Sequence, residues 1–326
     1  MPAMQRRSLL KLGFAAAALS GLDAFAQSRY PDRAVRLVVP FAPGGDGDII
    51  ARLWAKYAAV PLGGSIVVEN KPGAGGAIGA GEVARAAPDG YALLLGTTTT
   101  QIVNPATLAT PPYDAIRDFA LVGIVSMNPT CVVVNPALGI GSLKELVQKV
   151  KAEPGRFSYG SAGPGTITNL TGELLKHVGG LEMQHVPYKG GAPAMQDLVA
   201  GHIPVITPIL TSAVIAQHRA GRARILAVNS DERLKAAPEL PTAVEAGFAD
   251  LRVMVFNAVF APAGVPRAVL DALKAANAKA LAAAGLREDL EKAGAELFSG
   301  PDAARFVADE AKRWGALIKT MGFEGQ

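Results

Sequence analysis

The stretch that decides the fold is VRLVVPFAPGGDGDIIARLWAKYAA, residues 35–59. It opens with a short β-branched run, which predicts a buried strand. Apolar residues then recur at helical spacing, at Ile49, Leu53 and Tyr57, which predicts a helix. Between the two lies a turn of small residues, PFAPGGDG at 40–47. A strand, a glycine-rich turn and a helix in this order begin a crossover unit, so the stretch predicts an α/β fold.

The same arrangement recurs in the second half of the chain. A strand is expected at residues 157–159, and the turn GSAGPGT at 160–166 separates it from a run of helical period at 168–178. Similar strands and helices alternate around both units, and residues 267–321 read as helical apart from breaks at glycine. We therefore predict two α/β domains, each a mostly parallel sheet flanked by helices.

Composition supports a folded chain and excludes several classes of protein. With 326 residues, the chain is long enough for about two domains. Charged residues make up 18% of the chain. This share is lower than in typical globular proteins, which argues against disorder and against a charged coiled coil. The net charge is only +4 and aromatic residues make up 6%. No nucleic-acid-binding surface is therefore predicted.

Residues 1–26 have the three parts of an export signal. Arg6 and Arg7 precede the apolar run at 12–19, and Ala24-Phe25-Ala26 precede Gln27. The apolar run is about half of the ~20 residues that a membrane-spanning helix needs. We therefore expect cleavage after Ala26 and a periplasmic protein. The paired arginines resemble a twin-arginine signal, and the general secretory route stays open.

The two glycine-rich turns have the composition of an anion-binding site. Small residues let a ligand approach the backbone, and the helix that follows presents unpaired N–H groups and the positive end of its dipole. The threonines at 97–100 add hydroxyl groups after another predicted strand. Ligands of open α/β sheets bind beyond the carboxyl ends of the strands, so we expect both turns to hold one small organic acid. The alternative is a tight turn without a ligand, and Asp48 is interpreted as the helix N-cap.

Motifs for enzyme chemistry are incomplete. The run at 73–79 misses the spacing of a dinucleotide fingerprint, and the run at 160–163 lacks the first glycine of a nucleophile elbow. The four histidines are dispersed without metal-ligand spacing, and Cys131 begins an apolar strand. We predict a binding protein, not an enzyme, with no cofactor and no metal.

Six motifs extend along the chain after the export signal. They are VPFAPGGDGD (39–48), VENKPGAGG (68–76), APDGY (87–91), SAG (161–163), VPYKGGAPA (186–194) and FAPAG (260–264). Together they resemble the Bug-type periplasmic receptors of tripartite tricarboxylate transporters. The resemblance implies a two-domain, type II Venus-flytrap fold that closes on a small organic acid, often a carboxylate, and delivers it to a membrane permease. We expect a monomer, with no nucleic-acid partner.

Three positions depart from the pattern of that family and bear on specificity. Pro208 stands where the family often has an acid, Asn257 where it often has an aromatic residue, and Asn169 where it usually has histidine. A buried ammonium group without an acidic partner is costly. The departures therefore predict that a dicarboxylate binds better than an amino acid, unless Asp46 or Asp48 turns inward.

The expected domains are residues 27–129 with 251–326, and residues 130–250. The residues expected to bind the ligand are Phe41, Ala42, Gly44, Gly45, Asp46, Asp48, Thr97, Thr98, Ser161, Ala162, Gly163, Gly165, Thr166, Asn169 and Pro208. A periplasmic ligand sensor for a membrane signalling protein would share this architecture and is the alternative function.

Overall fold

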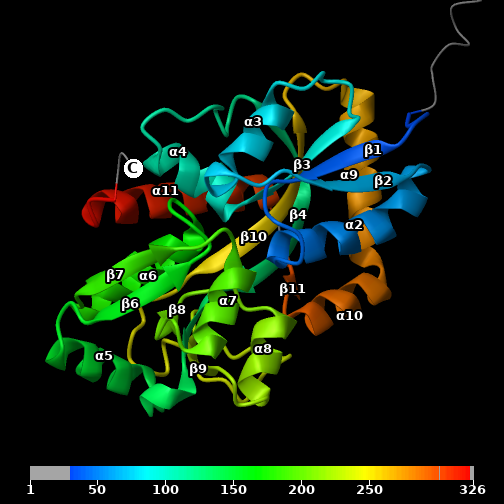
Figure 1. Ribbon diagram of the computed structural model, residues 1–326. Coiled ribbons are helices and arrows are strands. Elements are labelled where there is room, and N and C mark those ends of the chain that lie inside the picture. The colour runs from blue at the N-terminus through cyan, green and yellow to red at the C-terminus, as the bar shows by residue number, and fades with distance from the viewer. Residues whose placement is uncertain (1–29, 301, 324–326) are drawn as a thin grey trace, which may run out of the picture.

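Two β-sheets, each flanked by helices, form two lobes that lie side by side (Figure 1). The computed structural model describes residues 30–300 and 302–323, so the expected export signal lies outside the described residues. None of the described helices is both long and apolar enough to cross a membrane.

The sheet of lobe 1 has six strands in the order β11-β4-β10-β3-β1-β2. Their bounds are β1 (Val35–Val39), β2 (Ile66–Asn70), β3 (Ala92–Thr97), β4 (Phe119–Pro129), β10 (Met254–Pro262) and β11 (Glu296–Leu297). Strand β1 is parallel to both of its neighbours, whereas β10 is antiparallel to β3 and to β4.

The sheet of lobe 2 has five strands in the order β7-β6-β8-β5-β9. Their bounds are β5 (Cys131–Val134), β6 (Phe157–Ser161), β7 (Met183–Pro187), β8 (Val205–Ile206) and β9 (Arg224–Val228). The two-lobed α/β fold is confirmed, but both sheets are mixed where mostly parallel sheets were expected. The chain leaves lobe 1 along β4 and returns along β10, so these two strands run in opposite directions.

Ten α-helices and three short helical turns connect the described strands. The helices are α2 (Asp46–Leu62), α3 (Ala77–Ala84), α4 (Asn104–Thr107), α5 (Leu143–Ala152), α6 (Ile167–Gly179), α7 (Gly191–Ala200), α8 (Ser212–Arg219), α9 (Arg267–Ala282), α10 (Ala284–Ala293) and α11 (Ala303–Thr320). The turns are η2 (Ala74–Gly76), η3 (Thr99–Val103) and η4 (Pro136–Leu138).

The C-terminal stretch breaks at Gly294, as the sequence indicated, but the strand that follows the break was not expected. Gly294 ends α10 in the left-handed conformation, with φ at +85°. The chain then lies along the edge of β4 as β11, where Glu296 and Leu297 pair with Met127 and Ser126. The open edge of β4 offers backbone partners that no local sequence pattern reveals.

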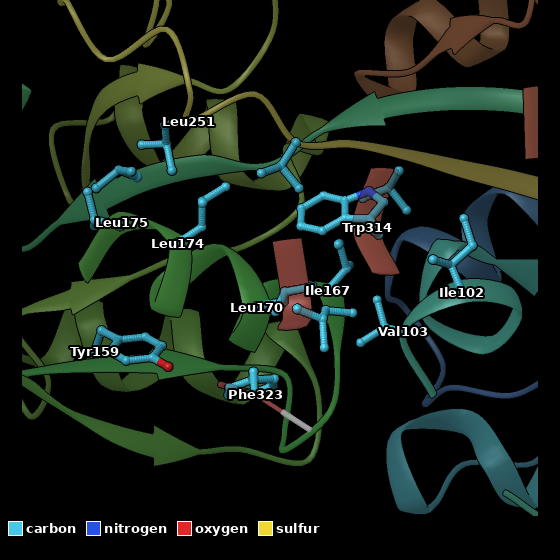
Figure 2. Close-up of a cluster of buried hydrophobic side chains, with 14 of the residues drawn as sticks. Ile102, Val103, Tyr159, Ile167, Leu170, Leu174, Leu175, Leu251, Trp314 and Phe323 are labelled. Atoms are coloured by element: carbon cyan, nitrogen blue, oxygen red, sulfur yellow. The ribbon is translucent and has the colours of Figure 1, made fainter. Parts of the chain in front are cut away.

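One apolar cluster is continuous between the lobes (Figure 2). Ile102 and Val103 of η3 and Trp314 of α11 belong to lobe 1, whereas Ile167 and Leu170 belong to α6 of lobe 2. All five side chains are buried. The cluster therefore joins the first turn of α6 to lobe 1.

The strands change sheet at Thr130, which lies between β4 and β5. Its backbone N–H donates to Val253 O at 2.9 Å, and its carbonyl accepts from Asn229 N at 2.9 Å. Its hydroxyl also accepts from the Asn229 side-chain amide at 2.8 Å. These bonds hold both crossings of the chain together at one point.

Candidate functional site

Loop 1, defined as Phe41–Gly45, ends at Gly45, the N-cap of α2. Within the described part of the chain, the backbone N–H groups of Gly45, Asp46 and Gly47 donate no hydrogen bond. A Cβ at Gly44 would meet nothing within 4 Å, so the loop is open on that side. Free N–H groups at the positive end of a helix dipole favour an anion.

Asp48 braces loop 1 and is not the N-cap that the sequence suggested. Its Oδ2 accepts from Gly44 N at 3.0 Å and from Arg52 Nε at 3.1 Å, and its Oδ1 accepts from the Asn70 amide at 3.0 Å. The same Asn70 amide donates to Phe41 O at 3.0 Å. Burial would raise the pKa of Asp48, but the bonds from Arg52, Gly44 and Asn70 outweigh burial and hold it below its usual range.

Asp46 is a buried carboxylate two residues before this brace. Its Oδ2 accepts from the Asn257 side-chain amide at 2.9 Å, and no described Lys, Arg or His forms an ion pair with it. The same amide nitrogen lies 3.3 Å from Ser126 Oγ and 3.4 Å from Asn128 Oδ1. Burial raises the pKa of Asp46 to about 6, and the Asn257 bond opposes that rise.

Three consecutive threonines at the end of β3 have different partners. Thr98 Oγ1 accepts from Phe256 N at 3.0 Å within lobe 1. Thr99 Oγ1 accepts from Ile167 N of lobe 2 at 3.1 Å. Thr97 Oγ1 is buried without any hydrogen-bond partner among the described residues. Thr99 therefore joins the two lobes, and of these three hydroxyls only that of Thr97 is unengaged among the described residues.

Loop 2, defined as Ser161–Thr166, hydrogen-bonds mainly with itself and with α6. Three of its N–H groups donate to nearby side chains: Ala162 to Thr168 Oγ1 at 2.9 Å, Gly163 to Ser161 Oγ at 3.1 Å, and Gly165 to Asn169 Oδ1 at 3.2 Å. Thr166 caps α6 by accepting from Asn169 N at 3.3 Å. The donors expected to hold an anion are thus engaged by side chains of the loop and of α6.

A buried polar network supports loop 2 from beneath. Ser161 Oγ lies 2.7 Å from His185 Nε2, and the His185 ring stacks on Tyr159. The Tyr159 hydroxyl accepts from Asn169 Nδ2 at 2.7 Å and donates to Glu173 at 2.6 Å. Burial lowers the pKa of His185, which favours the neutral ring. Since Asn169 Oδ1 accepts from Gly165 N, both polar atoms of the Asn169 side chain are engaged.

A glycine turn that sequence reasoning set aside lies between the two loops. A Cβ at Gly75 would lie 3.2 Å from Pro164 O of loop 2. A Cβ at Gly76 would lie 3.2 Å from the ring of Phe41 in loop 1. Both glycines have positive φ, at +59° and +93°, which L side chains rarely adopt. Their position after the carboxyl end of β2 was the available signal, because ligand loops follow strand ends in such sheets.

The last candidate, Pro208, is buried just after β8. Its carbonyl accepts from Cys131 N at 2.9 Å. The preceding Thr207 donates from its hydroxyl to Thr168 O at 2.7 Å, in the first turn of α6. Pro208 therefore lies at the carboxyl end of the lobe 2 sheet, close to the start of loop 2.

A separate groove of about 820 Å³ lies between α8 and α10. None of its lining residues belongs to loop 1, loop 2 or the threonines. Both basic and acidic side chains line the groove. Arg219 forms an ion pair with Glu239, and Lys292 forms one with Glu288. No described group of three or more His, Cys, Asp or Glu is placed to hold a metal ion. The loops and threonines at the carboxyl ends of the strands are therefore the stronger candidate site.

Two α/β lobes joined by two crossings, with helix N-termini at the junction, define the class of two-lobed solute-binding proteins. A family model described as "Tripartite tricarboxylate transporter family receptor" matches residues 50–323. The chain belongs to this family, whose members are binding proteins and not enzymes.

Relatives of known sequence and structure agree with this assignment. Protein BugT of Bordetella pertussis is 34% identical over 297 residues, 90% of each chain. A solved structure titled "R. palustris Rpa4515 with adipate" is 33% identical, with a TM-score of 0.86 over 91% of this chain and 100% of that one. MatC (Rpa3494) from Rhodopseudomonas palustris, with bound malate, is 30% identical, with a TM-score of 0.83 over 89% and 100%.

Proposed function

We propose that the protein captures a small carboxylate between its lobes and delivers it to the membrane permease of a tripartite tricarboxylate transporter. The observation that carries the proposal is the set of free N–H groups of Gly45, Asp46 and Gly47 at the start of α2. They lie at the junction of the lobes, and the structural relatives of this family hold adipate and malate.

Loop 1 supplies the anion donors in this proposal, and loop 2 closes the site from the other lobe. Asp48 and Asn70 hold loop 1 in place before the ligand arrives. Little ordering entropy is therefore lost on binding. Lobe 2 contacts lobe 1 at the threonines, where Ile167 N donates to Thr99 Oγ1. A ligand that touches both lobes favours the closed arrangement of residues 27–129 with 251–326 against residues 130–250.

The test is a Gly45→Leu variant measured by calorimetry with adipate, malate and succinate. Gly45 has an extended backbone with φ at −82°, and a Cβ there meets only Ala42 O at 3.6 Å. A side chain at this position is compatible with the fold but covers the free N–H groups. We expect affinity to fall about 10- to 100-fold, the equivalent of one or two lost charge-assisted hydrogen bonds.

The matched control is Gly315→Leu on α11, where an added Cβ meets nothing within 4 Å. It should leave affinity unchanged and should not lower thermal stability, because leucine favours a helix more than glycine does. Unaltered affinity in the Gly45→Leu variant would contradict the proposal. A substitution at Gly163 is a poorer test, because its φ of +129° strains any side chain.

We further propose that residues 1–26 direct export to the periplasm and are removed after Ala26. The mass of the protein in a periplasmic extract tests this, since the cleaved chain begins at Gln27. Replacing Arg6 and Arg7 by lysine should block export only if the twin-arginine route is used. We expect a monomer in solution. Nothing in the described fold favours the alternative of a signalling sensor.

A further inference from the structure

We propose that Asp46, Asn257 and Thr97 form an acceptor subsite for a protonated amine, so that the bound acid is an amino carboxylate. The inference rests on the proposed function, because it concerns the chemistry of the acid that the same site captures. It reverses the preference for a dicarboxylate that Pro208 and Asn257 suggested at the level of sequence.

The first observation is a concentration of unpaired acceptors. Within the described chain, Asn257 Oδ1 and Thr97 Oγ1 are both buried and have no hydrogen-bond partner. Their residues are 0% and 4% exposed. Buried polar atoms are nearly always hydrogen-bonded. Two unpaired acceptors in one place therefore indicate that a bound ligand supplies their donor.

The second observation is that these acceptors share one face of the sheet with Asp46. Asn257 and Thr97 are directly opposite each other in the antiparallel register of β10 and β3. Directly opposite residues place their side chains on the same face, within about 5.5 Å at Cβ. The Asn257 amide donates to Asp46 Oδ2, which brings the carboxylate to the same pair.

The charge of the subsite selects the chemistry of its partner. Asp46 is buried, and no described basic side chain forms an ion pair with it. A buried carboxylate without a cation loses solvation that the single amide donor of Asn257 repays only in part, whereas a second carboxylate placed there would be repelled. An ammonium group has three donors and no acceptor, which matches one carboxylate, one amide oxygen and one hydroxyl.

The position of Asp46 explains how one ligand reaches both kinds of group. Its backbone N–H is among the free donors of α2, whereas its side chain belongs to the acceptor subsite. A carboxylate at the helix N-terminus and an amine at the Asp46 side chain are therefore held by the same residue. This spacing fits an acid whose amine is on a carbon close to its carboxylate.

The experiment compares acids that differ only in an amine. Calorimetry at pH 7.5 uses the pairs succinate and L-aspartate, glutarate and L-glutamate, and propionate and L-alanine, with wild type and Asp46→Asn. We expect the amine to improve affinity at least about tenfold in one pair, and Asp46→Asn to remove that gain. Affinity for the amine-free member should stay the same or rise, because a negative charge leaves the site.

Thr97→Val is a second variant in case Asp46→Asn alters the loop. It removes one acceptor at constant shape, so it should weaken the amine-bearing acid and leave the amine-free acid unchanged. The matched control is Asp289→Asn, an equivalent change on α10 beside Lys56 and Tyr57, which should change neither affinity.

The pH dependence separates an ammonium contact from a general effect on the loop. Between pH 8 and pH 5 Asp46 takes up a proton, since its pKa is about 6. Affinity for the amine-bearing acid should fall over this range in wild type and stay level in Asp46→Asn. The inference would be overturned if the amine-free acid bound more tightly in every pair and if Asp46→Asn had the same preference as wild type. That result would leave the proposed function standing. Binding of no acid in the panel would overturn both.

Discussion

Loop 1 and loop 2 follow the first strand of each crossover unit and are both rich in glycine, alanine and proline, yet their backbone donors are used in opposite ways. In loop 2 the N–H groups of Ala162, Gly163 and Gly165 donate to neighbouring side chains. In loop 1 Gly44 N is engaged by Asp48, and the next three N–H groups are free within the described chain. Side chains with oxygen acceptors close to loop 2 make the difference, because they satisfy its donors without a ligand.

The same contrast separates the two acids that follow loop 1. Asp48 has donors from Gly44, Arg52 and Asn70, and its pKa is held low. Asp46 has the Asn257 amide as its donor, and its pKa is raised by burial. The comparison teaches that a carboxylate can stabilise or destabilise the same loop, depending on how many donors surround it. The variants below test that contrast.

The largest effect is expected for Asp46→Asn in the absence of ligand. The folded-state pKa of Asp46, about 6, lies above the unfolded value, so the folded protein loses stability as pH rises from about 4 to 6. Removing the charge should recover up to about 3 kcal/mol at pH 7.5. Urea unfolding at pH 4 and pH 7.5 measures this. A variant that is less stable than wild type at pH 7.5 would contradict it.

Asp48→Asn should have the opposite sign. The amide that replaces the carboxylate faces donors from Arg52 and Asn70, so the unfolding free energy should fall. We expect a loss of about 2 kcal/mol at pH 7, a value that includes the screening of the exposed Arg52 by solvent. Because the folded-state pKa is lowered, this stability is present above the unfolded pKa and lost as pH falls through the folded value. The gap between wild type and variant should therefore close in acid. A gap that persists at pH 2 would show a shape effect instead.

Asn169→Ala tests whether loop 2 is held by its own side chains. The substitution removes the acceptor of Gly165 N and a donor to the Tyr159 hydroxyl. We expect a loss of about 1 to 2 kcal/mol in unfolding free energy. Faster hydrogen exchange at Gly165, with loop 1 unchanged, would locate the effect. Unchanged exchange at Gly165 would show that loop 2 does not depend on this bond.

The smallest effect concerns Thr97 without ligand. Its hydroxyl is buried and has no partner in the described chain. Thr97→Val should therefore raise the unfolding free energy, by less than about 1 kcal/mol. Thermal unfolding of the ligand-free protein measures the change. Thr98→Val is the comparison, because Thr98 Oγ1 accepts from Phe256 N and its loss should destabilise. Equal shifts in both variants would show that the Thr97 hydroxyl has a partner.

Much of the fold could be predicted because its signals are local. The β-branched run at 35–39 and the helical period that follows appear as β1 and α2, with small differences at the ends. The recurrence of this unit at 157–178 correctly indicated a second lobe. Strand direction could not be predicted in the same way. Strand β10 pairs with β3, although the whole of lobe 2 separates the two strands along the chain.

The sequence by itself determined that there are two α/β lobes, that each has a small-residue loop between a strand and a helix, and that acids lie at positions 46 and 48. These properties depend on residue type and local spacing, which periodicity and turn chemistry fix. Only the tertiary structure decided which acid is braced and which is buried without a cation. That outcome depends on Asn257, Arg52 and Asn70, whose distances from the two acids are set by sheet order and helix packing and not by their neighbours in the chain.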